Sequence, residues 1–189
     1  MKYNPDIHHR KSIRLKGYDH SSEGLYFITI CTYQMEHLFG KILNNEMILN
    51  EYGKIVEEEI LRTLQIRENI CINNYVIMPN HIHFIIEIVK NDIKNVGAYG
   101  NMPNNEGVGK TEFYSIKKLK SPSKNIGSII RAIKAGATAR INEIRNSFCN
   151  PVWQRNYYEN IIRNEKRYLQ VIEYIENNPL KWKEDKYYL

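Results

Sequence analysis

Two histidines stand one residue apart in the hydrophobic run formed by residues 76–86. Side chains alternate between the two faces of a β-strand, so His81 and His83 would share one face, about 7 Å apart along the strand. Ile82 and Phe84 would point the other way, into whatever packs behind the sheet. Two imidazoles on one face can hold one divalent metal ion. The pair alone names no reaction, because two unrelated polar positions on a solvated strand face would show the same spacing.

A second group of side chains that could do chemistry lies between residues 170 and 178. Gln170, Tyr174 and Asn178 are four residues apart and would share one face of a helix. A phenol can be a nucleophile when its proton is removed or when a metal polarises the group it attacks. A carboxamide oxygen is a hard ligand that suits Mg²⁺ or Mn²⁺. The plainer alternative is that Tyr174 packs the helix onto a sheet and that Asn178 is the C-terminal cap.

The composition favours a soluble globular protein with an anionic partner. The chain of 189 residues has a formal net charge of +6 and a pI near 9.1, which suits nucleic acid. Its fourteen tyrosines could stack on bases or simply pack a sheet. No apolar run reaches the roughly 18 residues of a membrane-spanning helix, so no membrane partner is expected.

The cysteines and the N-terminus indicate a cytoplasmic protein. Cys31, Cys71 and Cys149 form no CxxC pair, so the sequence supports neither a zinc ribbon nor a disulfide framework. We expect all three to be buried thiols in a reducing compartment. The N-terminus is polar and basic and lacks the apolar core of a signal peptide.

Patterning predicts strands that alternate with helices. Runs rich in β-branched and aromatic residues predict four strands, at residues 25–33, 70–78, 81–89 and within 153–163. Residues 41–49 read as a small hairpin that turns at Asn44-Asn45. Helical period predicts three helices, one starting after Asn50, one at residues 126–144, and one running from Asn164 to a stop at Pro179. The first helix would keep Glu57, Glu58 and Glu59 largely outside, and the second would expose Arg131, Lys134 and Arg140.

This order of elements predicts an α+β fold, a ferredoxin-like sandwich with an antiparallel β-sheet and helices on one face. A C-terminal helix carrying Tyr174 would follow. We expect one domain over residues 1–189, with a basic arm at 1–24 and a flexible insertion at 90–124 that could order on a partner. The topology hosts many functions and decides none of them.

Nearly the whole chain resembles the single-tyrosine HUH transposases, and among them the REP-associated tyrosine transposases. His81-Ile82-His83 matches their motif of histidine, hydrophobic residue, histidine, and the pattern WQR…YI…NP is specific to the subfamily. The resemblance rests on the stretches HRKSIRLKGYD, YFITICTYQ, LFGKI, VIMPNHIHFII, NIGSIIRAIKA, VWQRNYYENIIRNEK and YIENNPLKW.

The resemblance implies an enzyme that cleaves and rejoins single-stranded DNA, with hairpin-forming DNA as its partner. Tyr174 would be the nucleophile, forming a 5′-phosphotyrosine link and releasing a 3′-OH. His81, His83 and Asn178 would hold Mg²⁺ or Mn²⁺. Many relatives have glutamine in place of Asn178, so this shorter amide would bind the metal directly or through a water. Some relatives exchange the tyrosine helix between two protomers, which leaves a homodimer open.

Basic residues of the arm, of the second helix and of the segment after it would contact DNA phosphates: Arg10, Lys11, Arg14, Lys16, Arg131, Lys134 and Arg155. Tyr157 and Tyr158 are rival nucleophiles, but they lie in a predicted strand without an amide one helical turn further on. Two other classes stay open. One is a DNA-hairpin binder that has lost catalysis; the other is a nuclease or phosphodiesterase that activates water and usually needs more carboxylate ligands.

Overall fold

The structure is a computed structural model that describes residues 21–89 and 125–188. Most of the predicted basic arm, the predicted insertion at residues 90–124, and the predicted DNA contacts at Arg10, Lys11, Arg14 and Lys16 lie outside the described residues. Among the described residues, no helix has the length and apolar character needed to cross a membrane.

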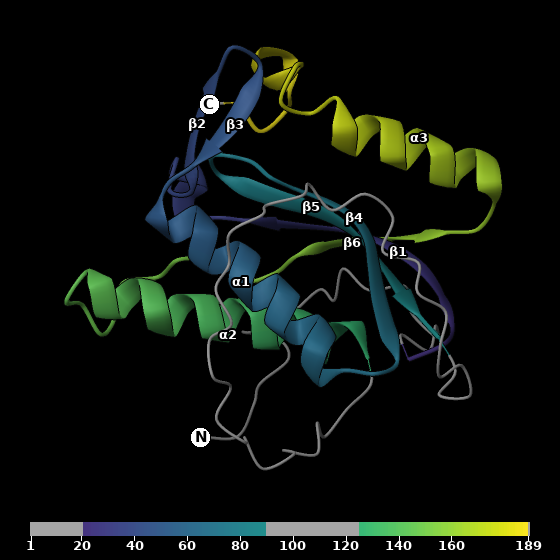
Figure 1. The fold of residues 1–189 in the computed structure, drawn as a ribbon, viewed down its shortest axis with the longest axis horizontal. Coiled ribbons are helices and arrows are strands. Elements are labelled where there is room, and N and C mark those ends of the chain that lie inside the picture. The colour runs from purple at the N-terminus through teal and green to yellow at the C-terminus, as the bar shows by residue number, and fades with distance from the viewer. Residues whose placement is uncertain (1–20, 90–124, 189) are drawn as a thin grey trace, which may run out of the picture.

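A four-stranded antiparallel sheet forms the centre of the fold (Figure 1). Its strands lie in the order β4-β5-β1-β6, and their bounds are Ile70–Ile77, His81–Ile88, Gly24–Cys31 and Tyr158–Ile162. The predicted ferredoxin-like order is confirmed, because the first strand lies between the third and fourth strands of the sheet and the second lies at an edge.

A separate hairpin precedes the first helix. It pairs β2 (Gly40–Leu43) with β3 (Glu46–Leu49), and its turn is at Asn44 and Asn45 as predicted. Both asparagines have positive φ, 50° and 64°, which a two-residue turn of this hand requires at both of its central positions.

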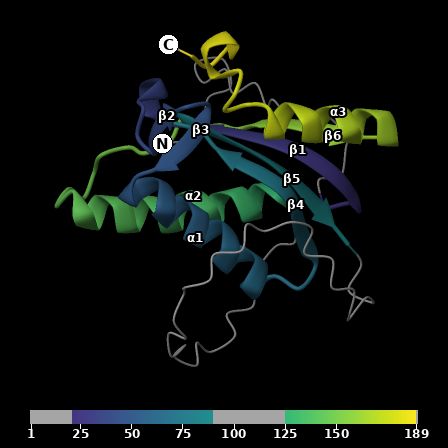
Figure 2. The same ribbon diagram turned by 45° about the horizontal axis from the view of Figure 1, so that its top comes forward.

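Within the described residues, α-helices cover both faces of the sheet (Figure 2). Helices α1 (Glu51–Ile66) and α2 (Ile126–Ile144) pack side by side, and α3 (Glu165–Glu176) lies on the opposite face. Each begins after an asparagine whose side chain accepts a hydrogen bond from the backbone N–H three residues further on; these caps are Asn50, Asn125 and Asn164.

The two faces of the sheet carry separate hydrophobic clusters. The larger cluster joins β1 and β5 to α1 and α2, and it includes Ile82 and Phe84, both 0% exposed, as the alternation predicted. The smaller cluster attaches α3 to the sheet through five buried side chains: Phe27, Ile85, Ile162, Val171 and Ile175. Helix α3 therefore depends on fewer apolar contacts than the other two helices.

The structure corrects two predictions about the helical faces. Glu59 is 5% exposed rather than outside, and its carboxylate pairs with Arg62 and Arg140. It fits between α1 and α2 because Gly136 has no side chain; a Cβ there would lie 2.1 Å from the Glu59 carboxylate. Arg140 and Lys134 are both only partly exposed, Arg140 because it also pairs with Glu58 across the two helices.

The predictions for the cysteines and for the end of β1 are also corrected. Cys71 and Cys149 are exposed and Cys31 is half-buried, since Cys71 lies near one end of the edge strand β4 and Cys149 follows the end of α2. Strand β1 ends at Cys31 because residues 33–35 form a 3₁₀ turn, η1, in which Gln34 and Met35 have positive φ.

Replacing Gly40 by alanine should lower the free energy of unfolding by more than replacing Gly24. Both glycines have φ of 143°, which strains any residue with a side chain by about 1–3 kcal/mol. A Cβ on Gly40 would also lie 2.1 Å from the Ile48 carbonyl oxygen, whereas one on Gly24 would meet no described atom within 4 Å. Urea unfolding of both variants measures the difference; equal losses would mean that the hairpin shifts to relieve the clash.

Candidate active site

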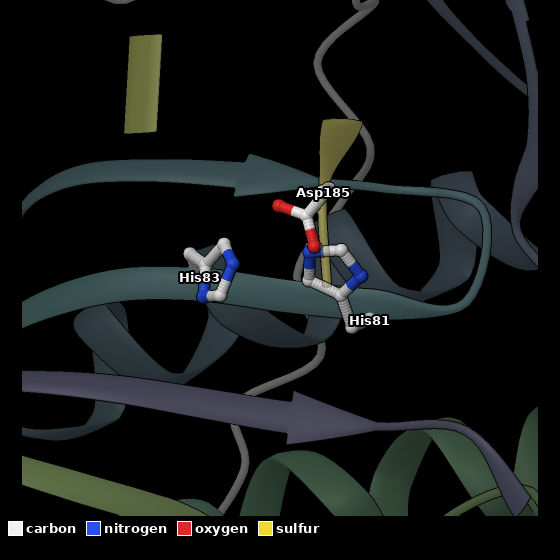
Figure 3. Close-up of side chains that lie close together, drawn as sticks. All are labelled: His81, His83 and Asp185. Atoms are coloured by element: carbon white, nitrogen blue, oxygen red, sulfur yellow. The ribbon is translucent and has the colours of Figure 1, made fainter. Parts of the chain in front are cut away.

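The two histidines lie side by side at the start of β5. His81 and His83 are 0% and 1% exposed, and their ring centroids are 4.5 Å apart. Both point to the face of the sheet that α3 covers, opposite the larger core. Figure 3 shows both imidazoles on one strand with the carboxylate of Asp185 beside them. The same-face placement expected from the spacing is therefore confirmed.

Buried hydrogen bonds fix the orientation of both rings. The Asn80 amide nitrogen donates to the carbonyl oxygens of Met35 and Tyr187. Its oxygen therefore faces His81 Nδ1 at 2.8 Å and accepts a hydrogen bond from it. His81 Nε2 is then left with a free lone pair. His83 Nδ1 lies 2.8 Å from the Thr29 hydroxyl, which can donate or accept and so serves either tautomer.

Helix α3 brings Tyr174 to the histidines. Val171 and Ile175 are buried against the sheet, and the Tyr174 ring meets Phe27 edge-on at 6.1 Å. The Tyr174 hydroxyl lies 3.1 Å from His83 Nε2, and the residue keeps 38% of its surface exposed. The phenol therefore lies beside two imidazoles that could hold a metal ion, and it is partly open to solvent.

The segment after α3 supplies a carboxylate that the sequence did not point to. Asp185 Oδ2 accepts hydrogen bonds from the Tyr174 hydroxyl at 3.1 Å and from the Asn178 amide nitrogen at 2.6 Å. Ligand atoms of His81, His83 and Asp185 all lie within 4.8 Å of one another. These three residues form a group that could hold a metal ion. Asp185 follows a short 3₁₀ turn, η2 (Trp182–Glu184), and no periodic pattern marks it.

Aromatic rings enclose this group. The Tyr187 ring lies 4.5 Å from the His81 ring, and the buried Trp182 ring lies 5.9 Å from it. Trp182 also contacts His37, and Lys186 lies over the Tyr187 ring. The segment from Trp182 to Tyr187 therefore covers the histidines and brings Asp185 to them.

Burial keeps both imidazoles neutral at pH 7. Burial lowers the pKa of His81 to about 4, although Asp185 and Asn178 partly oppose this shift. Burial, with His81 beside it, lowers the pKa of His83 well below its usual value. Burial and then Asp185 raise the pKa of Tyr174, so without a cation the phenol keeps its proton. Neutral imidazoles are the form that binds metal.

Two atoms of the site are suited to a metal ion. His81 Nε2 and Asn178 Oδ1 are buried, and neither has a hydrogen-bond partner among the described residues. Buried polar atoms are usually paired, so two unpaired atoms of ligand type in one site call for an explanation. Imidazole nitrogens together with amide and carboxylate oxygens can hold a divalent metal ion. Asn178 is not the helix cap, which is Asn177.

The rival tyrosines lie elsewhere. Tyr157 packs against the larger core on the opposite face of the sheet. Tyr158 shares the face of the histidines, but the register places Thr29 between it and His83. Tyr158 and His83 are therefore two strand spacings apart, roughly 10 Å.

The remaining predicted DNA contacts line one cavity of about 1280 Å³ between α2 and the segment that precedes β6. Arg131 and Arg155 are exposed there, beside the aromatic rings of Phe148 and Trp153. Lys134 also lines this cavity; its ammonium donates to the carbonyl oxygens of Gln154 and Asn156, and burial lowers its pKa to about 8.

A protein of Haemophilus influenzae (strain ATCC 51907 / DSM 11121 / KW20 / Rd), described as uncharacterised, is 47% identical over 188 residues. The alignment covers 100% of this chain and 98% of the relative. The chain belongs to the family of this Haemophilus protein. No protein-family model matches it.

The fold is also similar to that of solved structures. The REP-associated tyrosine transposase, solved bound to a REP hairpin, aligns with a TM-score of 0.57 over 92% of this chain and 77% of that protein, at 18% identity. The chain has the fold of this transposase. A candidate transposase of Deinococcus radiodurans R1 aligns over 87% of this chain and 95% of its own, at 14% identity and a TM-score of 0.43, which is too low to support an argument.

Metal-free protein should lose stability as the pH falls from about 6.5, the usual histidine pKa, toward the folded value of about 4 for His81. In this window the unfolded chain binds more protons than the folded one, so the loss approaches about 1.4 kcal/mol per pH unit for each such histidine. Urea unfolding in EDTA at pH 7 and pH 5 measures it. His81→Ala should flatten the dependence, and His37→Ala, at an exposed histidine, should not; equal slopes in all three proteins would contradict the neutral buried ring.

Proposed function

We propose that this protein is a metal-dependent, single-tyrosine DNA transposase that cleaves and rejoins single-stranded DNA through a 5′-phosphotyrosine intermediate. The observation that carries the proposal is the Tyr174 hydroxyl, 3.1 Å from His83 Nε2, beside the unpaired His81 Nε2 and Asn178 Oδ1. A nucleophile next to an open set of metal ligands is the arrangement that phosphoryl transfer needs.

In the proposed reaction the Tyr174 oxygen attacks the scissile phosphorus. The new bond joins this oxygen to phosphorus, the bond from phosphorus to the 3′ oxygen breaks, solvent takes the phenol proton, and the 3′ oxygen leaves as a hydroxyl. Rejoining reverses these steps, so the bond energy is kept in the phosphotyrosine and no ATP is required.

His81, His83 and Asn178 would hold Mg²⁺ or Mn²⁺. A bound ion would offset the charge of the phosphate and would make it easier for Tyr174 to lose its proton. The protein contributes buried, neutral imidazoles whose orientation Asn80 and Thr29 fix, and when Nδ1 of a ring carries its proton the Nε2 lone pair is available to an ion.

We propose a DNA hairpin with unpaired flanks as the substrate. The transposase of the same fold was solved with a REP hairpin, which supports this form of DNA. The cavity beside Arg131 and Arg155 offers guanidinium groups for phosphates and aromatic rings for unpaired bases. Its wall connects to the site through the backbone, since Gln154 N–H donates to the carbonyl oxygen of Cys31, whose strand partner is His81.

One observation favours a second function. Asp185 adds a carboxylate to the two histidines, and nucleases that activate water commonly use such ligands. A nuclease of this kind would cut DNA without forming a bond to the protein, so the fate of the DNA end distinguishes the two functions.

Tyr174→Phe should abolish a covalent protein–DNA adduct without weakening DNA binding, because it removes only the hydroxyl oxygen. The measurement is a denaturing gel after incubation with Mn²⁺ and a pool of single-stranded hairpins that have randomised flanks. Tyr158→Phe is the matched control and should keep the adduct. Peptide mapping that placed the phosphate on Tyr158, or cutting by Tyr174→Phe with no adduct, would overturn the proposal; the second result would favour the nuclease.

Arg131→Ala and Arg155→Ala should each weaken binding of the same hairpins and make it less dependent on salt. Each phosphate contact that is lost should lower the slope of log K against log salt concentration by about 0.7 for a single strand. Fluorescence anisotropy from low to high salt measures the slope. Arg62→Ala, at an exposed arginine of α1, is the control and should leave it unchanged. If all three variants matched the wild type, the cavity would not lie on the DNA path.

A further inference from the structure

We propose that Asp185 is itself a metal ligand, so that the segment from Trp182 to Tyr187 closes on the ion and completes its coordination. This inference rests on the proposed metal-dependent function and goes beyond the two histidines and the amide of Asn178. The spacing of the ligand atoms is the first argument. Those of His81, His83 and Asp185 lie within 4.8 Å of one another. Ligands of one octahedral ion, each about 2.1 Å from it, lie roughly 3 to 4.2 Å apart. At most one pair of these three ligands can be trans, so a closure of less than about 2 Å in each distance brings all three into contact with one ion.

The charge of the site is the second argument. An imidazole that binds a metal is neutral and Asn178 carries no charge, so these three ligands alone would surround a dication with no anion. Burying an uncompensated charge is costly. The Asp185 carboxylate supplies a negative charge within 4.8 Å of a ring nitrogen of each histidine. Its oxygens are also the hard ligands that Mg²⁺ and Mn²⁺ prefer.

The third argument is that this carboxylate is held in place before any metal binds. Its Oδ1 accepts from the Tyr187 N–H at 2.7 Å, and its Oδ2 accepts from the Asn178 amide, a residue that is 2% exposed. Trp182, 6% exposed, anchors one end of the segment, and the Asn80 amide anchors the other through the Tyr187 carbonyl oxygen. A loose surface acid would have none of these restraints.

The arrangement gives Asn178 a second role. Its Nδ2 positions the Asp185 carboxylate while its Oδ1 stays free toward the ion. Two histidine nitrogens and two oxygens would leave two of six octahedral positions for water or a phosphate oxygen. The Tyr174 hydroxyl, which also contacts Asp185 Oδ2, would then lie beside the ion.

The test is Mn²⁺ binding in the absence of DNA, at pH 7, after EDTA treatment and desalting. Electron paramagnetic resonance counts the free Mn²⁺, and isothermal titration calorimetry gives the dissociation constant. Asp185→Asn should weaken Mn²⁺ binding at least about tenfold. Glu184→Gln makes the same change of charge at an exposed neighbour in the same segment and should bind like the wild type. Asp185→Glu keeps a carboxylate and should bind more tightly than Asp185→Asn.

The controls separate this inference from the function on which it rests. Thermal unfolding of the metal-free variants checks that each is folded. If His81→Ala abolishes Mn²⁺ binding while Asp185→Asn binds like the wild type, the role of Asp185 is wrong and the metal site stands. If the wild type binds no Mn²⁺, or His81→Ala binds as tightly as the wild type, the metal site itself is wrong, and the inference fails with it.

Discussion

Alternate side chains of strand β5 lie on opposite faces of the sheet. Ile82 and Phe84 lie in the core under α1 and α2, while His81 and His83 lie against α3 on the other face. A shift of one residue in its pairing with β1 would exchange the two sets, placing imidazoles in the core and apolar side chains at the site. Both the packing of the core and the placement of the two histidines at the site therefore require the register that sets Thr29 opposite His83.

Burying two imidazoles is costly in free energy unless each ring nitrogen has a hydrogen-bond partner or a metal ion. Asn80 and Thr29 satisfy one nitrogen of each ring, and Tyr174 meets the second nitrogen of His83. Only His81 Nε2 is left over among the described residues. Asn178 Oδ1 is also unpaired, and the cost of leaving these two atoms without partners would be recovered when an ion binds.

Periodic patterns in the sequence predicted the helices and strands well, but they did not predict which side chains meet in the tertiary fold. The helix at residues 126–144 and the same-face histidines followed from spacing alone, because period fixes which side chains share a face. Asp185 could not be found this way, since it lies in an aperiodic segment and meets the histidines only through the tertiary fold. The predictions that Glu59 and Lys134 are exposed were wrong for a related reason, because spacing does not show what covers a polar face. The neighbouring helix covers Glu59 beside Gly136, and the carbonyl oxygens before β6 accept hydrogen bonds from Lys134.

The amide of Asn80 joins three segments that are far apart in the sequence, at Met35, His81 and Tyr187. During synthesis the hairpin of β4 and β5 emerges from the ribosome long before Tyr174, Asn178 and Asp185 exist. A nascent chain can therefore hold a paired sheet while it still lacks the nucleophile and the residues that cover the histidines. The proposed site is therefore complete only once the chain up to Tyr187 has been made and has folded, and a shorter product would lack its carboxylate and its cover.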